Sequence, residues 1–132
     1  MNVGEPAGGG LAQARHALGK IIGADLQRHI FLCAVSEKQE CCRREDGERA
    51  WAYLKTRMKE LGLVGPRKAD GRGGFHRSKA DCLRVCAAGP IALVWPDQVW
   101  YHSCTEAVLE RIIQEHLVGG VPVEEYRLRP AG

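Results

Sequence analysis

Six cysteines in a chain of 132 residues limit what this sequence can fold around. Four of them form two groups, Cys33 with Cys42 and Cys82 with Cys86, and each group lies beside the end of a predicted strand. Disulfides, a metal site and a redox site are the chemistries open to such a set. The N-terminus has no basic start followed by an apolar run and a small-residue cleavage site. We therefore expect no secretory signal and a cytoplasmic location, where metal ligands are favoured over disulfides.

Length and composition favour one ordinary domain. A chain of 132 residues with 45% hydrophobic content is enough to build a single core. The longest apolar stretches, such as Ile91 to Trp95, are far shorter than the ~20 residues that cross a bilayer, so we expect no membrane partner. A net charge of +3 is too small to indicate nucleic acid as a partner.

The charges are unevenly distributed along the chain. Between Arg67 and Arg84 there are six basic residues against Asp70 and Asp81, whereas six acidic residues between Asp97 and Glu125 have only Arg111 against them. This pattern predicts a molecule with opposed poles. Because the basic segment contains Cys82, it also predicts a positive face around the cysteines, which would dock on an acidic surface of a partner.

The first 27 residues are predicted to form an extension, partly disordered or helical, ahead of a domain that spans residues 28–128. Residues 1–10 are rich in Gly, Ala and Pro and offer little to bury. Leu11, Ala14, Leu18 and Ile21 recur at helical spacing, which predicts an amphipathic helix over residues 11–24. We expect that helix to pack loosely on the domain or on a partner.

Within the domain, the residue pattern predicts a strand over residues 29–35 that carries Cys33 near its end. A helix follows Cys42, with Trp51, Leu54 and Met58 on one face, and it ends at Gly62. Further along the chain, an extended segment is expected near residue 75. Mixed strands and helices in this order indicate an α/β fold.

The C-terminal part of the domain reads as a hairpin and a helix. Residues 91–95 and 99–102 flank Pro96-Asp97-Gln98, which is typical of two antiparallel strands joined by a turn. Ser103 with Glu106 three positions later is a candidate capping box. The helix that it would open carries an apolar face made of Leu109, Ile112, Ile113 and Leu117.

The cysteines alone leave several chemistries open. Four thiolates are what an iron–sulfur cluster needs, and loops at strand ends let separate segments bend toward one centre. Structural zinc sites usually contain Cys-x2-Cys knuckles, which this chain lacks, although zinc and unligated thiols both remain alternatives. Dithiol oxidoreductase chemistry also wants a Cys-x-x-Cys pair, and none is present.

Three segments carry a resemblance to a known family. They are Cys82-Leu-Arg-Val-Cys86 with its continuation through Gly89-Pro90 to Tyr101, the stretch from Glu115 to Glu124, and His29 to Cys33. Together they resemble the thioredoxin-like [2Fe–2S] ferredoxins over nearly everything from residue 28 to 128. The resemblance implies an α/β thioredoxin-like mixed sheet flanked by helices. It also implies a single [2Fe–2S] cluster as cofactor.

The resemblance implies that Cys33, Cys42, Cys82 and Cys86 are the cluster ligands. Cys41 is a rival to Cys42, and Cys42 is preferred because its distance from Trp51 matches the arrangement of the family. Cys104 has no counterpart among the family's ligands and is expected to pack as a small buried thiol.

The function that the resemblance implies is that of a one-electron carrier, a ferredoxin, which is not an enzyme. Its partners would be redox protein donors and acceptors. The alternatives are a cluster-bearing subunit of a larger redox complex and a zinc or iron–sulfur sensor module. The resembling ferredoxins pair through surfaces near the sheet, and Trp95, Trp100 and Tyr101 offer apolar area, so we also expect a homodimer. His76, His102 and His116 are interpreted as ordinary histidines.

Overall fold

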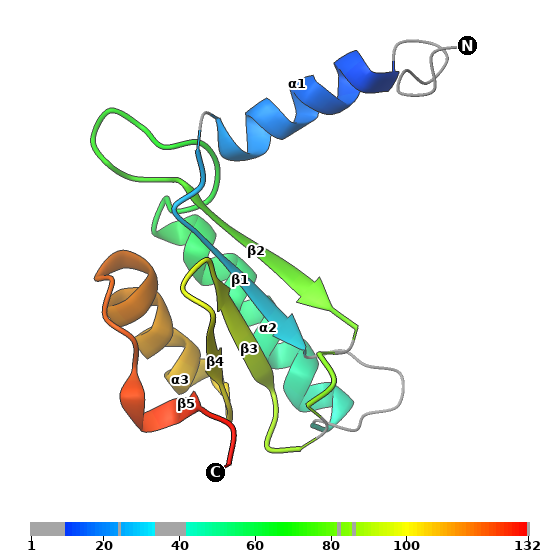
Figure 1. Ribbon diagram of the computed structural model, residues 1–132, viewed down its shortest axis with the longest axis vertical. Helices are drawn as coiled ribbons and strands as arrows, with labels where there is room; N and C mark the ends of the chain where they lie inside the picture. The colour runs from blue at the N-terminus through cyan, green and yellow to red at the C-terminus, as the bar shows by residue number, and fades with distance from the viewer. Residues whose placement is uncertain (1–9, 24, 34–41, 82, 86, 132) are drawn as a thin grey trace.

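The computed structural model describes residues 10–23, 25–33, 42–81, 83–85 and 87–131 (Figure 1). Expectations for residues 1–9 and for Cys41, Cys82 and Cys86 therefore lie outside the described residues. The helices and strands follow one another as α1 Gly10–Ile22, β1 Arg28–Cys33, α2 Arg44–Glu60, β2 Phe75–Ala80, β3 Ile91–Trp95, β4 Val99–Tyr101, α3 Glu106–Arg111, a π-helix Ile112–Val118, a 3-10 turn Glu124–Tyr126, and β5 Arg127–Leu128.

The strands form one mixed sheet in the order β2-β1-β3-β4-β5. β1 pairs with β2 in parallel, and the other neighbouring strands are antiparallel. In this register Cys33 lies beside Ala80 of β2 and Ile91 of β3. The end of β1, the end of β2 and the start of β3 therefore lie together at one end of the strands, which we call the cysteine end.

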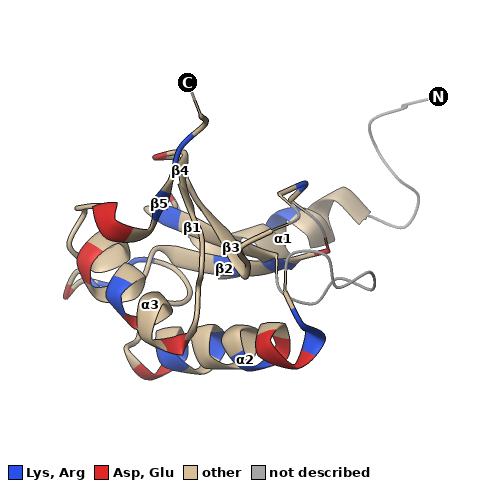
Figure 2. Ribbon diagram, turned by 90° about the horizontal axis from the view of Figure 1, so that it is seen from below, with Lys and Arg blue, Asp and Glu red and all other residues tan. Residues whose placement is uncertain are grey.

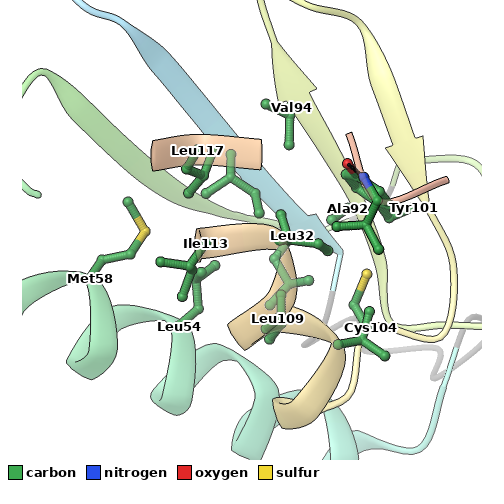
Figure 3. Close-up of a cluster of buried hydrophobic side chains, with 14 of the residues drawn as sticks. Leu32, Leu54, Met58, Ala92, Val94, Tyr101, Cys104, Leu109, Ile113 and Leu117 are labelled. Atoms are coloured by element: carbon green, nitrogen blue, oxygen red, sulfur yellow. Dashed lines mark hydrogen bonds between the residues drawn. The ribbon is translucent and has the colours of Figure 1, made fainter. Parts of the chain in front are cut away.

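The main core lies between the sheet and two helical segments. Successive strand residues point to opposite faces, and Ile30 and Leu32 of β1 are fully buried on the face that α2 and α3 cover (Figure 2). Figure 3 shows that Leu54 of α2, Leu109 of α3 and Ile113 of the π-helix point toward Leu32. This packing supplies the largest share of the apolar burial that stabilises the fold.

Most of the predicted elements are present. The amphipathic helix is α1, the helix after Cys42 is α2, and the strand around residue 75 is β2. The hairpin is formed by β3 and β4 in the predicted place. The strand predicted over residues 29–35 is β1, and its last two residues lie outside the described residues.

The predicted cap of the last long helix is wrong. Ser103 has a φ of 53° and its hydroxyl pairs with the His102 ring, so it does not begin the helix. Thr105 is the N-cap, and its hydroxyl accepts a hydrogen bond from the Val108 amide at 3.4 Å. The helix then continues as a π-helix, and its four predicted apolar residues Leu109, Ile112, Ile113 and Leu117 are all fully buried.

Across the part of the chain that the structure describes, no helix is both long enough and apolar enough to cross a bilayer.

Candidate metal centre

β1 delivers Cys33 to the cysteine end of the sheet. Because Ile30 and Leu32 face the main core, the alternation of a strand turns Cys33 to the opposite face. Cys33 is 3% exposed, and its Sγ lies 3.9 Å from the carbonyl oxygen of Asp81. That contact places the residue directly before Cys82 next to the Cys33 side chain.

Cys42 joins Cys33 in a small apolar group. Cys42 is half-buried and lies two residues before α2 begins. We call this group the Cys33 patch, and it consists of Cys33, Ile91, Cys42, Leu83, Val85, Trp100 and Leu128. Because Val85, Trp100 and Leu128 also line a groove of about 350 Å³, the patch borders a depression in the surface.

The segment that contains Cys82 and Cys86 approaches the same patch. Leu83 and Val85, which lie between those two cysteines in the sequence, both pack against Cys33 and Ile91. Arg84 has a φ of 68° and Ala88 a φ of 57°, so two non-glycine residues adopt the left-handed conformation on either side of Cys86. Such conformations are uncommon and tend to gather at functional sites.

The structure thus brings two of the predicted ligands, Cys33 and Cys42, together on one patch. Cys41, Cys82 and Cys86 lie outside the described residues. Cys104 is elsewhere, fully buried in the main core, where burial raises the pKa of its thiol far above the ordinary value. The expectation that Cys104 packs as a buried thiol is confirmed.

The described residues fit a sulfur-ligated group. Two thiols share one sheltered apolar patch, and described neighbours of Cys82 and Cys86 border it. Thiolate sulfur is the donor that iron–sulfur clusters use. Among the described side chains, which include only two of the four predicted ligands, no three His, Cys, Asp or Glu residues are grouped to hold a metal ion.

The sequence interpretation missed a buried polar network. The His116 ring is fully buried and contacts the Tyr101 hydroxyl at 2.8 Å and Asp97 Oδ2 at 2.7 Å. Arg28 donates to the same Asp97 oxygen at 2.8 Å, and the Val123 amide donates to the Tyr101 hydroxyl at 2.9 Å. The network joins the hairpin, the last helix and the C-terminal segment, which are the parts that contain two of the resembling segments.

Burial and charge set the ionisation of this network. Burial lowers the pKa of His116 and outweighs the opposing pull of Asp97, so the ring is neutral. Burial alone would raise the pKa of Asp97, but hydrogen bonds from Arg28 and His116 hold it below the ordinary value. Burial raises the pKa of Tyr101 to about 12. Asp97 and Arg28 therefore form the charged pair of the network.

The basic segment between Arg67 and Arg84 is divided between the two ends of the sheet. Arg67, Lys68 and Arg72 precede β2, whose first residue pairs with the first residue of β1, so these three lie at the end opposite Cys33. Lys79 pairs with Leu32 and is exposed near the cysteine end, and Arg84 follows it. Only part of the predicted positive face is therefore near the cysteines.

The predicted acidic pole is largely compensated by the chain's own arginines. Arg111 pairs with Glu115 at 2.9 Å and with Glu125 at 3.1 Å. Arg57 pairs with Glu110 at 2.9 Å, and Glu124 is paired with two further arginines, Arg127 and Arg129.

Comparison with known proteins places this arrangement in a class. No protein-family model matches the chain. A solved structure of a thioredoxin-like [2Fe–2S] ferredoxin from Aquifex aeolicus superposes with a TM-score of 0.63 at 22% identity, covering 83% of this chain and 98% of that one. A second structure from the same organism, of the wild-type ferredoxin, gives a TM-score of 0.59 at 21% identity, covering 81% of this chain and all of that one. The fold is therefore the mixed α/β fold of the thioredoxin-like ferredoxins, as predicted.

Curated relatives show the family. A 2Fe-2S ferredoxin of Aquifex aeolicus is 42% identical over 102 residues, which cover 74% of this chain and 85% of that protein. A 2Fe-2S ferredoxin of Clostridium pasteurianum is 27% identical over 105 residues, covering 77% of this chain and 96% of that protein. The chain belongs to the thioredoxin-like [2Fe–2S] ferredoxin family.

Proposed function

We propose that this chain is a ferredoxin, a one-electron carrier that holds a single [2Fe–2S] cluster. Membership of the ferredoxin family supports this function. The Cys33 patch is the observation that supports particular residues for this function. Two cysteines and the sequence neighbours of two more lie together there, at one end of the sheet. The chain itself performs no catalytic reaction, and a cytoplasmic location suits it because thiols stay reduced there.

The proposed ligands are Cys33, Cys42, Cys82 and Cys86. Support comes from the burial of Cys33 and from the positions of Leu83 and Val85, which border the patch between the last two ligands. Cys42 is preferred over Cys41 because its half-buried side chain packs in the patch. The bound cluster supplies a centre that accepts and releases one electron, at a potential set by its surroundings.

The chain's own residues have two tasks in this function. The apolar side chains of the patch shield the sulfur ligands from water, which restricts both hydrolysis and stray oxidants. The buried position of Cys33 fixes one ligand on a rigid strand rather than on a loop. A site held by a strand reorganises little when its charge changes.

We propose that the cysteine end docks on an acidic surface of the redox partner. Lys79 and Arg84 support this proposal, because they lie at that end, whereas Arg67, Lys68 and Arg72 do not. Exposed opposite charges speed encounter and are screened over about 8 Å at physiological salt. Reversing Lys79 and Arg84 to Glu should slow reduction by an acidic reductase, and a rate that stays unchanged would count against docking through this end.

We also propose a homodimer formed through the uncovered face of the sheet. Phe31 and Leu93 are register partners on the face opposite α2 and α3, as are His29 and Trp95. Trp95 is 50% exposed, whereas Tyr101, which the sequence suggested for the same surface, is fully buried in the main core and cannot contribute to it. A second copy would cover Trp95 and the neighbouring side chains of this face, and exposed apolar patches often mark protein interfaces.

Serine substitution of single cysteines tests the ligand set. We expect Cys33→Ser, Cys42→Ser, Cys82→Ser and Cys86→Ser each to lower bound iron or to shift the visible spectrum, because oxygen is a poorer ligand for the cluster than sulfur. Cys41→Ser and Cys104→Ser are the matched controls and should keep full iron content. Full iron in Cys42→Ser together with loss in Cys41→Ser would reverse our choice between the adjacent cysteines.

A further inference from the structure

Helix α1 contributes nothing to the core. None of its residues from Gly10 to Ile22 is buried, and the helix projects from the body of the molecule (Figure 1). Leu11 is 40% exposed, Leu18 is 53% exposed and Ile21 is 38% exposed. An isolated helix of this length is only marginally stable in water, so we expect its apolar side chains to pack against another surface.

The residues of α1 are sorted by type around the helix axis. At ~100° per residue, Leu11, Leu18 and Ile21 fall on one side with the neighbouring alanines and Ile22. Lys20 and His16 fall on the opposite side, and Arg15 borders the apolar side. The helix contains no acidic residue. An aliphatic face combined with a polar face whose charged residues are all basic is the pattern of helices that lie in a lipid interface.

A second, separate element adds positive charge at the same end of the molecule. Arg67, Lys68 and Arg72 are exposed in the loop before β2. The C-terminal end of α1 lies against this loop, since a Cβ placed on Gly23 would be 2.9 Å from Pro66 Cβ. Two acidic residues are nearby in the chain, Asp25 and Asp70, and Asp70 is paired with Arg72 at 3.3 Å. The net charge of this end is positive.

This basic end lies opposite the cysteine end. β1 begins at Arg28 on the side of α1, and it ends at Cys33 at the opposite end of the sheet (Figure 1). A surface that binds α1 and the basic loop would therefore leave the Cys33 patch exposed to other proteins. This separation suits an attachment site better than a contact through which electrons pass.

We propose that α1 and the loop of residues 67–72 attach this protein reversibly to the surface of a membrane that contains anionic phospholipid. The positive charge is spread over two elements, which matches an extended negative surface rather than one groove in a protein. A second copy of this chain is a poorer occupant, because its acidic residues are largely paired with its own arginines. This proposal departs from the sequence-based expectation of no membrane partner, which rested on the absence of an apolar stretch long enough to span a bilayer. A helix that lies in the interface needs no such stretch.

Vesicle binding tests the proposal on the full-length protein with its cofactor in place. Vesicles of phosphatidylcholine with about a third phosphatidylglycerol should carry the protein down in sedimentation, and pure phosphatidylcholine vesicles should bind it much less. Leu18→Gln should weaken binding about tenfold, because it removes one aliphatic side chain from the interface without lowering helix propensity much. Ala12→Gln, outside the aliphatic side of the helix, is the matched control and should change binding less than twofold.

Charge is tested separately in the loop. Arg67→Gln with Lys68→Gln should weaken binding to the anionic vesicles about tenfold and reduce its dependence on salt. No binding by the full chain would overturn the proposal and favour a protein groove as the site for α1. Equal binding to both vesicle types, or equal losses in Leu18→Gln and Ala12→Gln, would also overturn it. Iron content is measured on the same samples, so failure of the proposed carrier function would be recognised independently.

Discussion

At the scale of single residues, the fully buried His116 requires a hydrogen-bond partner for each of its ring nitrogens. Its two ring nitrogens are both engaged, one with the Tyr101 hydroxyl and one with Asp97. Each hydrogen bond links His116 to a segment that is distant in the sequence, and the Tyr101 hydroxyl in turn receives the Val123 amide. Removing the ring would leave buried polar groups without partners, which costs more than a hydrogen bond contributes.

His116→Phe should therefore lower the free energy of unfolding by about 2–3 kcal/mol, because the Tyr101 hydroxyl and Asp97 each lose a buried partner. Urea unfolding followed by circular dichroism measures the change. His16→Phe, the same substitution on exposed α1, is the control and should stay within about 0.5 kcal/mol. Equal stability of the two variants would show that the network is dispensable.

His29 predicts how stability depends on pH. Burial, followed by the charge of the neighbouring His76, lowers the pKa of His29 to about 4 from the ordinary 6.5. The unfolded chain then binds the proton more readily than the folded one, so the stability that neutral His29 provides is present above pH 6.5. It is lost as the pH falls from 6.5 toward 4.

Between pH 7.5 and pH 5.5 we expect His29→Gln to lose about 1 kcal/mol less stability than the unmodified protein. Gln can still hydrogen bond with the Ser78 hydroxyl, which lies 2.8 Å from the His29 ring. Comparing the two proteins at each pH removes effects that both share. Parallel pH profiles would contradict a half-buried ring that is neutral in the folded protein.

At the scale of elements, the periodic apolar pattern of the sequence predicted the longer helices and the hairpin. It did not predict the shortest strand or a residue whose conformation is set by tertiary contacts. Apolar periodicity located α1, α2 and the hairpin, since burial on one face imposes it directly. The two-residue strand β5 has no room for a pattern. Ser103 is not the cap that its sequence pattern predicts, because tertiary contacts hold its backbone in the left-handed conformation. One of these contacts is the hydrogen bond from its amide to the Ala88 carbonyl at 2.7 Å.

The candidate site was predictable in its residue types but not in its surroundings. The spacing of the cysteines and the family resemblance led to Cys33 and Cys42, which the fold brings together. The division of the basic segment was not predictable, because it depends on β2 running parallel to β1. The pairing of Asp97 with His116 could not be read from the sequence either, since it requires the hairpin turn to contact a helix nineteen residues further on.

The end of the last helix depends on a glycine. A Cβ added to Gly119 would lie 2.6 Å from the carbonyl oxygen of Glu115, a backbone atom that cannot move without shifting the helix. Gly119→Ala should therefore lower the free energy of unfolding by about 1–3 kcal/mol. Gly19→Ala, where a Cβ would meet no atom within 4 Å, is the control and should not destabilise the protein. Thermal unfolding of both variants decides this prediction, and a stable Gly119→Ala protein would contradict it.

At the scale of the whole molecule, the two faces and the two ends of the sheet present four different surfaces. One face is closed by α2 and α3 (Figure 2). The opposite face carries the exposed Trp95, the register partner of His29. One end of the sheet carries the Cys33 patch, and the other end carries α1 and the basic loop of residues 67–72. The Cys33 patch lies at the cysteine end of the same uncovered face, because Trp100 of the patch is the register partner of Leu93. The basic end lies at the other end of the strands, so attachment there would leave the patch exposed.

The dimer proposal is tested by a charge on the uncovered face. Trp95→Lys should shift the protein from dimer to monomer in sedimentation velocity at micromolar concentration, because a charge opposes burial against a second copy. Val121, 66% exposed and outside this face, provides the control Val121→Lys, which should remain dimeric. A monomeric unmodified protein at these concentrations would remove the proposal.

The central claim is that this chain holds one [2Fe–2S] cluster and exchanges one electron. Electron paramagnetic resonance of protein purified without oxygen, before and after dithionite, tests it most directly, with iron and sulfide assayed on the same sample. We predict two irons and two sulfides per chain, no signal when oxidised, and a signal of a single unpaired electron per chain after reduction. A colourless protein that contains zinc, or one whose signal does not change with dithionite, would contradict the account.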